Sequence, residues 1–158
     1  MVRKHFLFLL FSWLLFVMNA CGNAESSDHA ETEEKKTMAQ KIQIQLDGRV
    51  FNAVLYENAS AKDFLAQLPL TLTLSDFNGT EKIADLPKRI SEEGAPAGFK
   101  PEAGDIAYYA PWGNLAIFYR DFRYSERLIR IGKIEGDGLK FLRNCDNRKI
   151  EIRPVDSH

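Results

Sequence analysis

The side chains that could carry chemistry in this sequence are aromatic rings, amides and carboxylates. Aromatic residues concentrate at residues 104–119, GDIAYYAPWGNLAIFY. Tyrosine and tryptophan there can offer an apolar ring together with a polar atom, as binding grooves often do. Glu81 follows the turn signal Asn78-Gly79 and is a candidate general acid. The candidate ligand-binding residues are Glu81, Tyr109, Trp112, Asn114, Tyr119 and Tyr124.

Each candidate also has a structural interpretation. Glu81 could be a solvated charge at the end of a strand, and Trp112 could cap the mouth of a barrel. Asn114 could offer its amide to a peptide backbone or cap a local turn. The tyrosines could belong to the core. A group of arginines could attract anions, but interspersed acidic residues favour a mixed, solvated surface; these arginines are Arg120, Arg123, Arg127 and Arg130.

The composition excludes several classes of site. Histidine occurs only at positions 5, 29 and 158, and residues 41–157 contain a single cysteine, Cys145. A Ser-His-Asp triad, a Cys-His nucleophile or a histidine-based zinc site cannot be built within residues 41–157. The sequence contains neither a phosphate-binding P-loop nor a GxGxxG motif. We therefore expect no metal and no cofactor.

The first twenty residues have the layout of a secretory signal peptide. Arg3 and Lys4 give a basic start, and residues 6–18 are apolar except for Ser12. This apolar run is shorter than the roughly 20 residues that a membrane-spanning helix needs. Cleavage near Ala20 would release the rest of the chain on the far side of the membrane.

The end of this segment resembles the lipobox of bacterial lipoproteins. Small Ala20 precedes Cys21 and Gly22 follows it, whereas Met18 and Asn19 depart from the usual pattern. The resemblance implies a lipid on Cys21, and with it a membrane as partner and a place in the cell envelope, in the outer membrane or on the periplasmic side if there are two membranes. Simple cleavage would instead give a soluble secreted protein.

Residues 21–40 lack apolar periodicity and are rich in acidic residues, so we expect a disordered tether before a domain at residues 41–158. Charges in that domain balance, and it has no block of lysine or arginine, which argues against nucleic acid as a partner. If Cys21 carries lipid, we expect Cys145 to be a small buried or half-buried residue without a disulfide partner. A Cys21–Cys145 disulfide is the alternative.

Within the expected domain, the order of polar, apolar and turn-forming residues predicts short strands separated by turns. Residues 41–46 alternate polar and apolar, Asp47-Gly48 predicts a type I′ turn, and residues 49–56 return as a second strand. A capping box beginning at Ser60 predicts a short helix through Leu68. Further strands are expected at residues 70–74, 80–86, 105–110, 114–119, 128–131 and 149–153, and one helical turn at residues 139–142.

The strand at residues 114–119 is apolar at nearly every position, which suits a strand covered on both faces. Residues 90–101 are punctuated by glycine and proline and predict a long loop. About eight closely spaced short strands indicate a sandwich or a closed barrel, with Ile106, Leu115 and Ile117 at its centre.

Three segments resemble the bacterial cyclophilin-like family: residues 61–87, residues 93–99 (EGAPAGF) and residues 104–119. The resemblance implies a mainly β fold, a closed cyclophilin-like β-barrel of about eight strands with one or two short helices. Cyclophilins that isomerise prolyl bonds use an arginine with a phenylalanine and a glutamine nearby, and a distal tryptophan and histidine. That constellation cannot be placed on this sequence, so the fold alone does not imply catalysis.

Two functions remain. The first is a membrane-tethered binding module that captures a peptide or a small ligand near Tyr109, Trp112, Asn114 and Tyr124 without catalysis. The second is a peptidyl-prolyl isomerase acting on exported proteins, in which an arginine such as Arg120 polarises the amide. We favour the first, because an isomerase groove should show its arginine and glutamine in recognisable context.

Overall fold

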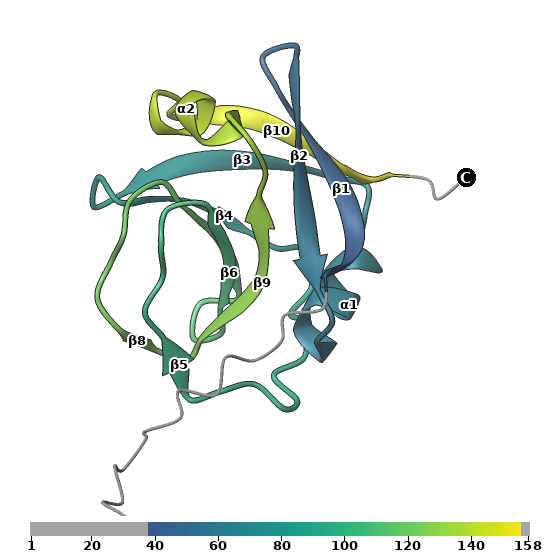
Figure 1. The fold of residues 1–158 in the computed structure, drawn as a ribbon, viewed down its shortest axis with the longest axis vertical. Coiled ribbons are helices and arrows are strands. Elements are labelled where there is room, and N and C mark those ends of the chain that lie inside the picture. The colour runs from purple at the N-terminus through teal and green to yellow at the C-terminus, as the bar shows by residue number, and fades with distance from the viewer. Residues whose placement is uncertain (1–37, 156–158) are drawn as a thin grey trace, which may run out of the picture. The chain divides into compact units, whose positions relative to one another are not determined.

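The computed structural model describes residues 38–155 of the 158-residue chain. The predicted signal peptide, Cys21 and most of the predicted tether lie outside these residues. Within residues 38–155, no helix is long and apolar enough to cross a membrane. This part of the chain folds into ten strands and two short helices (Figure 1).

Eight of the strands close a barrel in the order β1-β10-β3-β4-β7-β6-β9-β2, and every neighbouring pair is antiparallel. The prediction of a mainly β, closed barrel with short helices is confirmed. The strands are β1 (Met38–Leu46), β2 (Arg49–Tyr56), β3 (Leu70–Phe77), β4 (Glu81–Asp85), β5 (Gly98–Phe99), β6 (Asp105–Tyr109), β7 (Asn114–Phe118), β8 (Ser125–Glu126), β9 (Leu128–Ile134) and β10 (Arg148–Pro154), and the helices are α1 (Ala59–Leu65) and α2 (Gly138–Arg143).

The opening hairpin forms where the sequence predicts it. Strands β1 and β2 pair from Leu46↔Arg49 outward, and Asp47 and Gly48 have φ angles of 47° and 76°. Two successive residues with positive φ are what a type I′ turn requires, and the Asp-Gly pair tolerates them.

The barrel encloses one apolar core. Ile106, Leu115 and Ile117 are buried within it, as predicted, together with inward-facing residues of every barrel strand. Since successive residues of a strand point to opposite faces, the neighbours of these residues face outward. On β6, β7 and β9 those neighbours are also apolar, and they form a second cluster outside the barrel: Ala107, Ala116, Phe118 and Leu128.

A small second layer covers this outer cluster. β5 and β8 pair with each other as a separate two-stranded sheet, and Phe99 and Phe122 pack on the cluster. Strand β7 is therefore buried at all five positions, as its continuous apolar run predicts. Figure 1 shows β5 and β8 beside the barrel wall, at the end of the long loop.

The first helix begins differently from the prediction. Asn58 is its N-cap, and its side-chain oxygen accepts a hydrogen bond from Ala61 N at 2.8 Å. The predicted capping box at Ser60 is wrong, because Ser60 is buried inside the first turn and its hydroxyl donates to Ser91 O. The helix also ends earlier than predicted, at Leu65. The second helix is observed at residues 138–143, one residue longer at each end than predicted.

Candidate functional site

A pocket of about 430 Å³ lies on the outer face of the barrel. Strands β4, β6 and β7 form its floor, and the segment at residues 122–126 and the turn between β6 and β7 form its sides. Most of its walls are apolar or aromatic, with a few polar groups among them. The lining residues are Phe77, Asn78, Thr80, Glu81, Ile83, Tyr109, Trp112, Asn114, Phe118, Phe122, Arg123, Tyr124, Ser125, Glu126 and Leu128.

Strand alternation decides which residues reach the pocket. On β4, Glu81 and Ile83 face outward, while Lys82 and Ala84 are buried toward the barrel interior. The register with β7 places Glu81 opposite Phe118 and Ile83 opposite Ala116. The floor therefore runs from an acidic residue at one end over apolar side chains toward Asn114.

Trp112 stands on the turn between β6 and β7. Gly113 ends this turn with a φ of +77°, a conformation that glycine adopts without strain, and its N–H donates to Tyr109 O at 2.9 Å. Arg89 braces the same turn, because its guanidinium donates to Ala110 O at 2.8 Å. The braced turn holds the indole over the pocket while leaving it 57% exposed.

Three aromatic rings meet at this edge of the pocket. The ring of Trp112 lies 5.5 Å from Phe77 and 5.4 Å from Tyr109, centre to centre, with interplanar angles of 87° and 83°. These edge-to-face contacts are a favourable arrangement for aromatic rings. They fix the rings relative to one another and give the pocket a rigid aromatic side.

Glu81 is partly buried at the start of β4, where the register of β3 with β4 places it opposite Phe77. Burial raises the pKa of its carboxyl group to about 7, and the nearby negative charge of Asp76 adds to the shift. Among the described residues, no side chain forms an ion pair or a hydrogen bond with this carboxylate. Such a pKa is suited to proton transfer near neutral pH. The pocket lining contains no histidine and no cysteine that could act beside this carboxyl group.

Asn114 is buried in the pocket wall at 2% exposure. Its Nδ2 donates to Leu115 O at 3.1 Å, and its Oδ1 has no hydrogen-bond partner among the described residues. The amide is thus held by its own strand, and a buried acceptor remains open.

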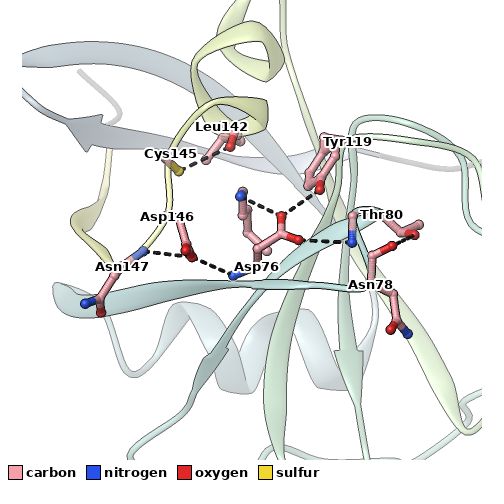
Figure 2. A network of polar contacts seen from close by, with 10 residues as sticks. Asp76, Asn78, Thr80, Tyr119, Leu142, Cys145, Asp146 and Asn147 are labelled. Atoms are coloured by element: carbon pink, nitrogen blue, oxygen red, sulfur yellow. Dashed lines mark hydrogen bonds and ion pairs between the residues drawn. The ribbon is translucent and has the colours of Figure 1, made fainter.

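The structure brings together five of the six predicted site residues and separates the sixth. Glu81, Tyr109, Trp112, Asn114 and Tyr124 all line the pocket, and the side chain of Tyr124 is exposed at its rim. Tyr119 lies outside the lining, since its hydroxyl donates to Asp76 Oδ1 at 2.6 Å (Figure 2). Asp76 also forms an ion pair with buried Lys82.

Arg120, the arginine considered for an isomerase, lies outside the lining as well. The arginine that does reach the pocket is Arg123, an exposed side chain whose guanidinium carbon lies 5.3 Å from the centre of the Phe122 ring. Among residues 38–155 there is no group of three histidine, cysteine or acidic side chains that could hold a metal ion.

The apolar part of the pocket was not among the predicted site residues; it consists chiefly of Phe77, Ile83, Phe118 and Phe122. The sequence could have indicated Phe122 as a site residue, because it is one of only two aromatic residues in the polar segment at residues 120–127. Cys145 is buried, as predicted, and its thiol donates to Leu142 O. Burial raises the pKa of this thiol, which keeps it in the unreactive neutral form.

The fold and the site can be compared with known proteins. A solved structure, the solution structure of a hypothetical protein from Archaeoglobus fulgidus, matches with a TM-score of 0.54 and 18% sequence identity, covering 78% of this chain and 99% of that one. At this identity the likeness concerns the fold alone. No curated protein matches the chain. The model of the cyclophilin-like family matches residues 44–153, which is most of the sequence, and the chain belongs to this family.

Proposed function

We propose that this cyclophilin-like domain is a binding module that takes a peptide or a small ligand in its outer pocket, without catalysing a reaction. The observation that carries the proposal is the pocket itself. It joins an apolar floor to a rim of exposed Trp112 and Tyr124, and such a mixture of apolar surface with few polar groups is typical of ligand sites.

The charged groups of the pocket favour binding over prolyl isomerisation. An isomerase would need a fixed cation beside the substrate amide, whereas Arg123 is exposed and held only by its contact with Phe122. The better-held cation, Lys82, is committed to Asp76 on the other side of the sheet. The pocket therefore offers surfaces to hold a ligand and no positioned group to twist a peptide bond.

The test is a titration of the full chain carrying Trp13→Phe, which leaves Trp112 as its only tryptophan. We expect N-acetyl tetrapeptide amides from a mixed panel to shift the Trp112 emission. Tyr124→Ala should weaken that response, whereas Val50→Ala, an equally exposed apolar residue outside the lining, should not. Flat titrations across the panel would remove the support for binding, and prolyl isomerase activity that is lost in Arg120→Ala would replace the proposal with the enzymatic one.

We further propose that the domain is held in the cell envelope by a lipid on Cys21. The support comes from the sequence around that residue, an apolar segment followed by Ala-Cys-Gly. Mass spectrometry of the membrane fraction should find a diacylglycerol-modified N-terminal cysteine. An unmodified protein in the soluble fraction would refute this membrane attachment and would leave the proposed ligand binding untouched.

A further inference from the structure

The polar groups of the outer pocket show which ligand it would accept, if it is a binding site as proposed above. Two of them make no hydrogen bond or ion pair with the described residues: the partly exposed carboxylate of Glu81 and the buried Oδ1 of Asn114. Both are hydrogen-bond acceptors when Glu81 is ionised. A ligand that satisfies them must supply donors.

Glu81 lacks a cation for a structural reason. Its chain neighbour Lys82 points through the sheet to the barrel interior, where its Nζ lies 2.7 Å from Asp76 Oδ1. The remaining charged residues of the lining are exposed, namely Arg123 and Glu126. A partly buried carboxylate without a counter-charge is unfavourable, and a ligand cation would relieve that cost.

The hydrogen bond that the Asn114 amide already makes shows which of its two polar atoms is without a partner. Because Nδ2 donates to Leu115 O, Oδ1 is the amide atom left free, and exchanging the two would place two acceptors against each other. A buried acceptor left unpaired costs about 1–3 kcal/mol. An N–H donor of a ligand would recover that free energy.

The aromatic side of the pocket suits a positive charge as well. Trp112 is exposed over more than half of its surface, with Phe77 and Tyr109 set at nearly right angles to it. The faces of such rings attract ammonium groups. An anionic ligand would meet no buried cation in this lining, whose charged residues other than Glu81 are the exposed Arg123 and Glu126.

We propose that the pocket takes an ammonium group on an apolar stem, with the charge at Glu81, the stem over Ile83 and Phe118, and a second N–H donor on Asn114 Oδ1. In the sheet register Glu81 lies opposite Phe118 and Asp85 opposite Asn114, so the backbone positions that carry the two acceptors are four residues apart along β4. That separation is about 13 Å. A lysine side chain with its own backbone N–H, plus a hydrogen bond of about 2.9 Å at each end, spans a similar length.

The test compares four probes at pH 8 on the full chain carrying Trp13→Phe, followed by Trp112 emission. The probes are N-acetyl-lysine methylamide, its norleucine counterpart without the ammonium, the corresponding glutamate derivative, and pentylamine, which has the ammonium but no amide. We expect the lysine derivative to bind about tenfold more tightly than the norleucine derivative. Pentylamine should fall between them, which distinguishes a peptide lysine from a free amine.

Variants connect this preference to the two acceptors. Glu81→Gln should bind the lysine and norleucine derivatives equally, whereas Glu135→Gln, a partly buried glutamate outside the lining, should keep the preference. Far-UV circular dichroism of both variants shows whether the barrel is intact. The preference should also shrink at pH 6, because the pKa of Glu81 is about 7. The other charged groups near it are Asp76 and, in the same lining, Arg123 and Glu126.

The outcomes separate this inference from the proposed function. Equal binding of the lysine and norleucine derivatives, or tighter binding of the glutamate derivative, would overturn the ammonium assignment and leave a binding pocket. Pentylamine that binds as tightly as the lysine derivative would remove the contact with Asn114. If no probe and no tetrapeptide changes the emission at millimolar concentration, both the inference and the binding function are wrong.

Discussion

Lys82 and Asp76 form an ion pair in which Nζ lies 2.7 Å from Oδ1 and the lysine side chain is only 2% exposed. Tyr119 donates its hydroxyl to the same carboxylate oxygen, and Gly79 N donates to the other oxygen (Figure 2). The network joins the end of β3 to β4 and to the end of β7. It lies on the inner side of the same sheet whose outer side forms the pocket, so it fixes the strand that presents Glu81.

Removing Asp76 should destabilise the barrel. In Asp76→Ala the buried ammonium of Lys82 loses its counter-charge, and we expect a loss of about 2 kcal/mol, less than for a fully enclosed pair because the Asp76 side chain is 31% exposed. Urea denaturation followed by circular dichroism measures it. Tyr119→Phe removes one hydrogen bond and should cost about 1 kcal/mol. If Asp76→Ala and Tyr119→Phe cost the same, the ion pair is not the dominant interaction.

The pH dependence of stability should reveal Glu81. Its pKa is raised from 4.5 to about 7 in the folded protein, so between these values the folded state holds a proton that the unfolded state has released. Stability from this group is therefore present at low pH and lost as pH rises through about 7, by at most about 3 kcal/mol. Asp76 has the opposite sign, because its hydrogen bond from Lys82 lowers its pKa and its contribution is lost only in acid.

Glu81→Gln isolates this effect, since the substitution removes the titrating group and nearly preserves its shape. The variant should be more stable than the parent at pH 8 and should match it at pH 4.5, and the histidines of the chain cancel in the comparison. Free energies of unfolding from urea titrations at both pH values supply the measurement. A constant difference between the two proteins would show that Glu81 ionises normally.

Much of the barrel could be predicted because the sequence patterns that indicate its strands and turns each extend over only a few residues. The Asp47-Gly48 turn and the apolar run of β7 each determine a backbone conformation or a burial pattern over a few residues. The pocket could be predicted only in part, since it needs contacts between distant segments. Tyr109 and Trp112 are close in sequence, but Phe77 joins them only through the pairing of strands, and Phe122 arrives on a segment without periodicity.

Tyr119 shows where prediction of the site from the local sequence fails. Its position after an aromatic strand predicts a ring at the pocket, but strand alternation alone does not determine which face a residue just past the strand end takes. The choice depends on Asp76, which is 43 residues away and offers an acceptor on the inner side. Lys82 lies on that side by strand alternation, together with Ala84, but its pairing with Asp76 depends on the contact between β3 and β4. Neither partner can be found from the local sequence.

Arg89 should control the position of Trp112. Its guanidinium donates to Ala110 O and Pro111 O, and its stem packs beside Gly113, so Arg89→Ala frees the turn between β6 and β7. We expect a lower fluorescence anisotropy of Trp112 and a ligand affinity weaker by roughly threefold. Arg127→Ala is the matched control, because that arginine pairs with Glu92 outside the pocket. An unchanged anisotropy in Arg89→Ala would mean that the turn is rigid without its brace.

Gly98 should be essential for the side of the pocket built by residues 122–126. A Cβ at this position would lie 2.2 Å from the backbone oxygen of Ser125, so Gly98→Ala forces β5 and β8 apart. The barrel itself does not include either strand, and we expect a loss of about 2 kcal/mol with little change in circular dichroism. Limited proteolysis should then cut within residues 120–127, and ligand binding should fall. Ser125→Ala keeps the same backbone pairing and should resist cleavage; equal protection of the two variants would show that the β5–β8 contact does not hold this segment in place.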